Sequence, residues 1–156
     1  MIALAALSAC GGGSTKTSGP QLPRPAYVAK ANAICAQTNQ RIKNGAATAF
    51  TDPNQAASQD PALVQTFAST VVLPALQSEY SQLTALRPTS DTNPHATLSA
   101  LEDATDKWEA DKALIASLGD TSFAQFDRMA TDFGMTTCAT TDMVVRSIAG
   151  GSQAAT

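Results

Sequence analysis

The sequence contains few of the residues from which nucleic-acid-binding surfaces are built. Charged residues make up 15% of the 156 residues and aromatic residues 5%. The ten Lys and Arg residues are spread along the chain, and the formal net charge at pH 7 is −3. Proteins that bind nucleic acids usually carry a clustered basic surface. We therefore expect no nucleic acid among the partners of this chain.

The chain also lacks the sequence motifs of the common enzyme classes. It contains no H-E-x-x-H, G-x-S-x-G, P-loop or G-x-G-x-x-G pattern. The single histidine, His95, cannot form a metal site alone, because such a site needs two or more nitrogen or sulfur donors close together. We interpret His95 as a solvated or helix-capping residue and predict no catalytic residue, no metal and no cofactor. A hydrolase that uses His95 with an unidentified serine is the enzymatic alternative.

No apolar run reaches the length of a transmembrane helix, about 20 residues. Instead, the short apolar segment 1–9 ends in Leu7-Ser8-Ala9-Cys10, which is followed by three glycines. This order resembles the lipobox of bacterial lipoproteins, in which the cysteine is lipid-modified and becomes the first residue of the mature chain. The resemblance implies a lipid anchor on Cys10 at the extracytoplasmic side of the cell membrane; the alternative is a buried structural cysteine. Segment 1–9 looks truncated, because signal peptides usually have about 15 to 30 residues and a positively charged start.

The composition divides the rest of the chain into three parts. Residues 10–25 are rich in Gly, Ser, Thr and Pro, so we expect a flexible tether that carries the lipid-anchor cysteine. Residues 26–148 have a helical periodicity and almost no strand pattern, and residues 149–156 are expected to form a disordered tail. Ala supplies 30 residues of the chain, whereas Leu, Ile, Val and Phe together supply only 28. The core of this single domain is therefore expected to be thin and rich in alanine.

Two helices are predicted in the first half of the domain. The first covers about residues 26–44 or a little more, where apolar residues recur at helical spacing. The second begins at Asp60-Pro61, an N-cap followed by a proline at the first helical position. Pro74 interrupts its pattern, so we expect a kink or two helices that meet there. The segment ends before Pro88.

Two more helices are predicted in the second half. Asn93-Pro94 repeats the combination of cap and proline and starts a helix that we expect to end at Gly119. The fourth helix begins with Ser122 and Gln125 in capping-box spacing and ends at Gly134. This number of helices with short connections favours an all-α fold, an antiparallel up-and-down bundle of about four helices.

The cysteine count supports both the lipid anchor and one disulfide. If Cys10 carries lipid, Cys35 and Cys138 are left as a pair in an oxidising compartment. A bridge between them would close a loop of about 100 residues and contribute up to about 4.7 kcal/mol by restricting the unfolded chain. The alternative, a redox-active pair, lacks a C-x-x-C motif and a nearby cation that would lower a thiol pKa. We therefore predict a structural disulfide.

Residues 31–42 read A-x-A-I-C-x-x-x-N-x-R-I, and Phe133-Gly134-Met135 precedes Cys138. These two motifs resemble those of an uncharacterised group of small helical envelope proteins in actinobacteria, in which a late F/Y-G-L-x-x-C element recurs, often behind a lipoprotein signal. The resemblance covers roughly residues 26–139. It implies the helical fold and the cysteine pair, but no activity.

The single tryptophan, Trp108, is part of one candidate binding site. We interpret it as a core residue first, and as the lining of a groove between helices second. Together with Phe67, Tyr80 and Phe126 it could form an apolar pocket for a lipid or another small ligand.

An acidic face is predicted on the third helix, because Glu102, Asp106 and Glu109 fall at positions i, i+4 and i+7. We interpret this face as a solvated flank, and the alternative is a surface for calcium or a basic partner. A di-iron bundle is excluded, since it would need Glu-x-x-His pairs.

These features favour a lipid-anchored, non-enzymatic interaction or binding module of the cell envelope. Its partners would be the membrane, through the anchor, and an envelope protein or small ligand that the sequence does not identify. The alternative function is a carrier of a lipid or small apolar ligand in a pocket between helices.

Overall fold

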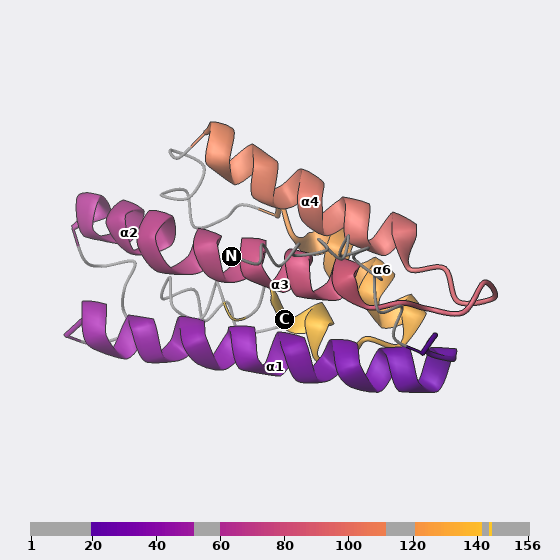
Figure 1. Cartoon of the computed structure of the whole chain (residues 1–156). Helices are drawn as coiled ribbons and strands as arrows, with labels where there is room; N and C mark the ends of the chain where they lie inside the picture. The colour runs from indigo at the N-terminus through magenta and orange to yellow at the C-terminus, as the bar shows by residue number, and fades with distance from the viewer. Residues whose placement is uncertain (1–19, 52–59, 112–120, 142–143, 145–156) are drawn as a thin grey trace, which may run out of the picture.

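The structure of the protein, a computed structural model, describes residues 20–51, 60–111, 121–141 and 144. These residues form an antiparallel bundle of helices and contain no strand beyond one isolated bridge (Figure 1). The predicted all-α bundle is therefore confirmed. Its helices are α1 (Arg24–Ala49), α2 (Pro61–Phe67), α3 (Leu73–Ala85), α4 (His95–Ala110) and α6 (Ala124–Phe133).

Helices α2 and α3 together form one bent rod. Between them, Ala68–Val72 make a turn of π-helix, closed by a bond from the Leu73 amide to the Ala68 carbonyl. Pro74 follows in the first turn of α3; it has no amide to donate, and its ring disturbs the preceding turn. Prolines and π-helical turns are the usual places where helices bend. The predicted break at Pro74 is confirmed, with the irregular turn just before the proline.

Helix α1 approaches this rod closely at Gly45. A Cβ atom at Gly45 would lie 2.5 Å from Cγ1 of Val71 and 3.3 Å from Cε2 of Phe67. A larger side chain therefore does not fit unless the π-helical turn shifts. Buried alanines allow close helix packing elsewhere in the bundle, as the composition led us to expect: Ala31, Ala46, Ala75, Ala100, Ala104 and Ala130.

Most helix ends follow the predicted local signals. The amide of Ala62 donates to Oδ1 of Asp60 at 2.9 Å, which caps α2. Gly134 adopts a φ of 93° and ends α6 in the left-handed conformation. Helix α4 begins at His95 with Pro94 as its N-cap, one residue later than the predicted pair of Asn93 cap and first-turn Pro94; Oδ1 of Asn93 accepts a bond from the His95 amide at 3.1 Å. These bonds connect neighbours in the sequence, which is why the sequence predicts them.

Two predicted boundaries are wrong. Helix α4 ends at Ala110 and not at Gly119, because Asp111 leaves the helical region with φ −129° and ψ 89°. Residues 112–120, which include the predicted end, lie outside the described residues. The N-cap of α6 is Phe123 in place of Ser122, and the Phe123 side chain is buried in the core.

The predicted disulfide between Cys35 and Cys138 is present, with Cα atoms 5.0 Å apart. Cys35 lies on α1 and Cys138 begins the 3-10 turn Cys138–Thr140, and both side chains are buried. Next to the bridge, Nδ2 of Asn39 donates to Oγ1 of Thr140 at 2.9 Å. The bridge and this bond tie the last described turn to the first helix.

None of the helices in the described part of the chain is both long enough and apolar enough to span a lipid bilayer.

Candidate functional site

A pocket of about 420 Å³ lies at the end of the bundle where the chain enters α1, on the right in Figure 1. The first turn of α1, the end of α3, the start of α4 and the loop between α3 and α4 surround it. The amide of Thr92 donates to the Thr89 carbonyl at 2.9 Å, and the two hydroxyls lie 3.2 Å apart. These contacts hold the loop in the shape that forms one wall.

The lining of this entry pocket combines apolar walls with neutral polar groups. No Lys, Arg, Asp or Glu is among its lining residues, and its volume lies in the usual range for small-molecule sites, about 300 to 1,000 Å³. The apolar lining consists of Tyr27, Leu83, Leu86, Pro88, Pro94 and Leu98. The polar lining consists of Thr84, Thr89, Ser90, Thr92, Asn93 and His95.

Tyr27 is a fully buried residue of the entry pocket whose hydroxyl has no hydrogen-bond partner among the described residues. The ring packs edge-on against Phe133, with centroids 5.9 Å apart. Burial raises the pKa of Tyr27 to about 12, so the hydroxyl stays neutral and keeps its proton to donate. An unpaired buried hydroxyl is unfavourable, and a partner inside the pocket would relieve that cost.

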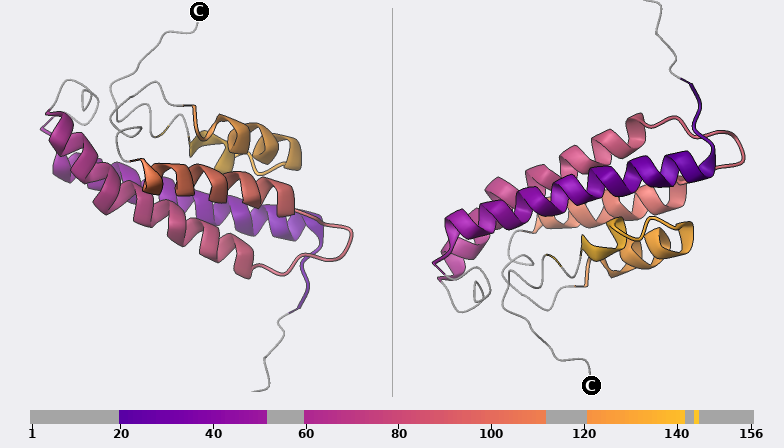
Figure 2. Two further views of the ribbon diagram at one scale, coloured as in Figure 1. Left: turned by 90° about the horizontal axis from the view of Figure 1, so that it is seen from above. Right: turned by 90° about the horizontal axis from the view of Figure 1, so that it is seen from below.

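The chain that leads into α1 is fixed to the rim of the entry pocket. The amide of Leu22 donates to the Arg87 carbonyl at 2.7 Å, and the amide of Thr89 donates to the Leu22 carbonyl at 2.9 Å. Figure 2 shows this segment beside the loop between α3 and α4 in both views. The predicted tether therefore ends at the pocket, and not at the opposite end of the bundle.

His95 lies at the exposed edge of the entry pocket. Its Nδ1 is 3.4 Å from Oγ of Ser99, longer than the usual hydrogen bond of a hydroxyl group, about 2.5 to 3.0 Å. Among the described residues, no group of three or more His, Cys, Asp and Glu is arranged to hold a metal ion. His95 therefore has Ser99, one turn later on α4, as its neighbouring hydroxyl.

A second unusual feature is the carboxyl group of Glu79 on α3. The residue is fully buried, and neither carboxyl oxygen has a hydrogen-bond partner among the described residues. The closest hydroxyl, that of Thr38 on α1, donates to the Ile34 carbonyl at 3.3 Å. Buried carboxyl groups are normally paired or hydrogen-bonded, so Glu79 is the least satisfied charged residue in the described core.

The surroundings of Glu79 change its titration. Burial raises the pKa of Glu79 to about 7, the Thr38 hydroxyl opposes part of the rise, and the charge of Asp127 on α6 adds to it. The carboxyl group is therefore poised to gain or lose its proton near neutral pH. Glu79 is not among the site residues predicted from the sequence. One signal was present, because Glu79 lies three residues after Leu76 and four before Leu83, on the apolar stripe itself.

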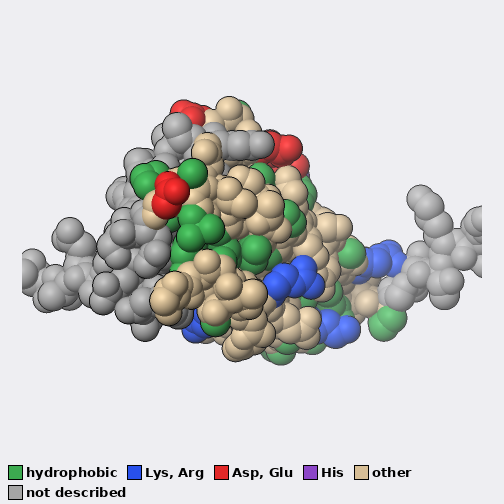
Figure 3. Space-filling view, turned by 90° about the vertical axis from the view of Figure 1, so that its left-hand side faces the viewer, with side chains coloured by type: hydrophobic (Ala, Val, Ile, Leu, Met, Phe, Trp, Pro, Cys, Tyr) green, Lys and Arg blue, Asp and Glu red, His purple; other side chains and the backbone are tan. Residues whose placement is uncertain are grey.

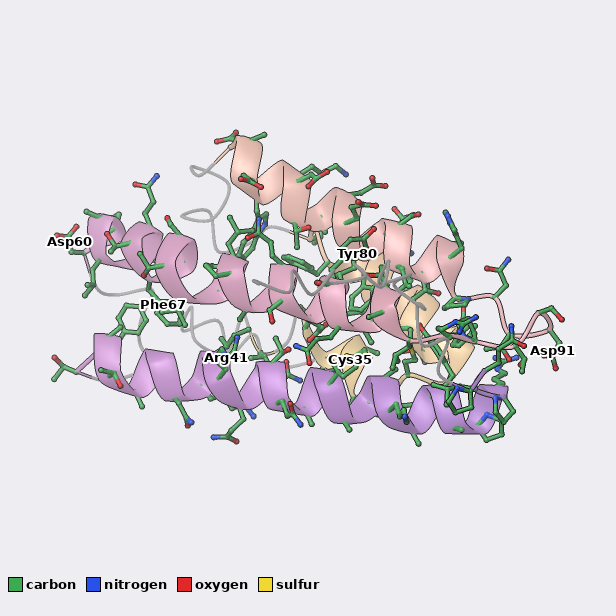
Figure 4. The ribbon with its side chains drawn as sticks, viewed as in Figure 1. Cys35, Arg41, Asp60, Phe67, Tyr80 and Asp91 are labelled. Carbon is green, nitrogen blue, oxygen red and sulfur yellow. A yellow bond between two sulfur atoms is a disulfide. The ribbon has the colours of Figure 1, made fainter. Side chains whose placement is uncertain are left out.

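The four residues predicted to form an apolar pocket are distributed through the core. Trp108 packs edge-on against Phe123, and Phe67 against Phe50, each pair with ring centroids 5.0 Å apart. Phe126 is fully buried. Tyr80 is half-buried and lies between α3 and α4 (Figure 4). None of the four lines the entry pocket, so a ligand site around Trp108 stays a prediction.

The predicted acidic face of α4 is exposed to solvent. Glu102, Asp106 and Glu109 are all exposed, and Glu109 accepts a bond from Nε2 of Gln77 at 3.1 Å. A hydrogen bond to Glu102 raises the pKa of Tyr80. Figure 3 shows acidic side chains toward the top of the view, where α4 runs, and Lys and Arg side chains lower down. The face is a solvated flank whose acids bond to neighbouring polar groups of α3.

Cys10, the predicted lipidation site, lies outside the described residues. The disulfide accounts for the other two of the three cysteines. Comparison of the chain with protein-family models, with curated proteins and with solved structures finds no match.

Proposed function

We propose that this chain is a lipid-anchored, non-enzymatic binding module of the cell envelope, attached through Cys10 to the extracytoplasmic side of the membrane. The observation that carries the proposal is the disulfide between Cys35 and Cys138. Structural disulfides form and persist in oxidising compartments outside the cytoplasm. Because this bridge uses two of the three cysteines, Cys10 is left for a different role, and it stands in the lipobox-like order Leu7-Ser8-Ala9-Cys10.

The position of the tether agrees with such an anchor. Leu22, where the chain is fixed to the loop between α3 and α4, lies twelve positions after Cys10. A fully extended chain spans at most about 3.6 Å per residue, so this tether reaches roughly 40 Å at most. The anchor would keep the entry pocket, and the end of the bundle that contains it, within that distance of the bilayer.

The entry pocket favours ligand binding as the task of the module. It is concave, mostly apolar and contains convergent neutral polar groups, which is the usual character of small-molecule sites. A carrier or binder of a lipid or small apolar ligand is therefore the more specific form of the proposal. An interaction with another envelope protein is the second form, for which the exposed acidic face of α4 is the available charged surface.

Metabolic labelling tests the anchor. The protein is tagged at its C terminus in the cells that encode it, and the cells are fed an alkyne-labelled fatty acid. We expect label on the wild-type protein and in its membrane fraction, and neither with Cys10→Ala. A variant with both Cys35→Ser and Cys138→Ser is the control, because it changes the other two cysteines and must keep the label. Label that persists in Cys10→Ala would refute the anchor.

A further inference from the structure

We propose that the entry pocket binds an uncharged, mostly apolar small molecule whose polar group forms a hydrogen bond with the Tyr27 hydroxyl. This inference deepens the proposed function. It rests on the proposed lipid anchor only where it names the membrane as the source of the ligand. The pocket itself is defined by the described residues of α1, α3 and α4 and by the loop between α3 and α4.

The size of the entry pocket limits the class of ligand. At about 420 Å³ it can enclose a small molecule, but not a folded domain or a helix. It lies at an end of the bundle, where its apolar lining includes Leu83 of α3, Leu86 directly after α3 and Leu98 of α4. These side chains would bury an apolar body of the ligand and remove it from water.

The lining of the entry pocket contains no Lys, Arg, Asp or Glu side chain, and this composition is unsuited to an ionic ligand. A phosphate, sulfate or carboxylate bound inside would need a Lys, an Arg or a cluster of amide donors, and an ammonium group would need a carboxylate. None of these charged side chains lines the pocket. A charged ligand would therefore lose its hydration without gaining a partner of opposite charge.

The Tyr27 hydroxyl is the hydrogen-bond donor that the polar group of the ligand would bind. Tyr27 is among the residues that line the entry pocket; its side chain is fully buried, and its hydroxyl has no hydrogen-bond partner among the described residues. A ligand hydroxyl, ester or ketone oxygen would accept its proton. The Thr89 hydroxyl, by contrast, is already close to Thr92 and to the Leu22 carbonyl, at 3.2 and 3.3 Å. Tyr27 is thus the unsatisfied group, and the threonines shape the rim.

The tether connects the entry pocket with a source of such molecules. Because Leu22 is bonded directly to the pocket loop, the lipid anchor would hold the opening close to the bilayer. Uncharged molecules with an apolar body concentrate in membranes. Uncharged apolar solutes that diffuse in from water would fit the pocket equally well. A separate experiment therefore tests whether the ligand comes from the membrane or from water.

The binding test uses the full-length protein with Cys10→Ala and the disulfide formed, which separates binding from anchoring. The probes are 1-octanol, which is uncharged, and octanoate, which has the same chain length and a carboxylate. Two-dimensional NMR follows the backbone amides during titration. We expect 1-octanol to shift the signals of Leu83–Leu98 and Tyr27 in a saturable way, and octanoate to bind at least tenfold more weakly.

Two variants test the role of the pocket residues. Tyr27→Phe keeps the ring and removes only the hydroxyl, and we expect it to weaken 1-octanol binding about threefold to tenfold, the usual effect of one net hydrogen bond. Thr84→Phe places bulk at an exposed rim position and should block binding without disturbing the core. Tyr80→Phe is the matched control. It removes the hydroxyl of the second tyrosine of the chain, which does not line the pocket, so this variant should bind 1-octanol like the parent protein.

The possible results separate this inference from the anchor. Equal binding of octanoate and 1-octanol, unchanged binding in Tyr27→Phe and Thr84→Phe, or shifts confined to the surroundings of Trp108 would overturn it. Native mass spectrometry then compares the lipidated protein from membranes with Cys10→Ala from the aqueous fraction. An uncharged ligand carried only by the lipidated protein supports the membrane source, and a ligand carried equally by both refutes that source. Lack of label on Cys10 would refute the anchor, but it would not affect the binding result, because the binding test uses Cys10→Ala protein.

Discussion

Replacing Glu79 with glutamine should make the protein more stable at neutral and alkaline pH. The substitution keeps the size and shape of the side chain and removes its ability to ionise. In the folded protein the carboxyl group lies among buried side chains, with Thr38 and Asp127 as its polar neighbours and no hydrogen bond to either oxygen among the described residues. Ionisation there is unfavourable compared with ionisation in water.

The pKa of Glu79 gives the magnitude and the sign of the effect. It rises from 4.5, its ordinary value, to about 7 in the folded protein. Below pH 4.5 the carboxyl group is protonated in both states, and no penalty exists. Between pH 4.5 and 7 the unfolded chain loses the proton and the folded protein keeps it, so the free energy of unfolding falls as the pH rises. Above pH 7 the loss is complete and amounts to about 3 kcal/mol, since each pKa unit corresponds to about 1.4 kcal/mol.

Thermal unfolding followed by circular dichroism from pH 4 to 9 measures this effect. We expect the melting temperatures of wild type and Glu79→Gln to be similar near pH 4 and to diverge up to pH 8, where the variant should melt roughly 10 °C higher. Glu109→Gln is the matched control, because Glu109 is exposed on α4, and its curve should run parallel to that of the wild type. A constant difference between wild type and Glu79→Gln from pH 4 to 9 would refute the assigned pKa, and so would a variant that is less stable throughout.

Three further perturbations have predictable results. Cys35→Ser together with Cys138→Ser should lower the free energy of unfolding by about 2 to 5 kcal/mol, because the bridge closes a loop of 103 residues; an unchanged urea midpoint would contradict this. Gly45→Ala should cost about 1 to 3 kcal/mol through the contact with Val71, and Val71→Ala should recover part of that loss in a double-mutant cycle. Gly134→Ala should cost about 1 to 2 kcal/mol, because its φ of 93° is unfavourable for any residue with a Cβ atom; equal melting temperatures for the variant and the wild type would show that the end of α6 adapts.

The fold was largely predictable because its signals act over short distances in the sequence. The cap of Asp60, the break at Pro74 and the left-handed end at Gly134 each depend on residues within one or two helical turns. The disulfide was predictable by counting, once Cys10 was set apart from Cys35 and Cys138. The end of α4 was not predictable, because the apolar pattern continues past Ala110 while the backbone of Asp111 leaves the helix.

The candidate site was not predictable from local patterns. The sequence draws attention to Trp108 because it is the single tryptophan, but its ring fills the core against Phe123. The entry pocket is lined by Tyr27 of α1 together with Leu83 of α3 and Leu98 of α4, and more than 50 residues separate Tyr27 from the other two. No periodicity or spacing encodes such a meeting point.

The sequence by itself determined the helical class, most helix boundaries and the cysteine pairing. Only the tertiary structure decided that neither carboxyl oxygen of Glu79 has a hydrogen-bond partner among the described residues, and that the hydroxyl of the pocket residue Tyr27 is buried without one. The physical reason is that a helix and its caps are made by neighbours in the chain. Desolvation, in contrast, depends on every element that packs around a group, and the segments that enclose Tyr27 and Glu79 are brought together only when the bundle forms.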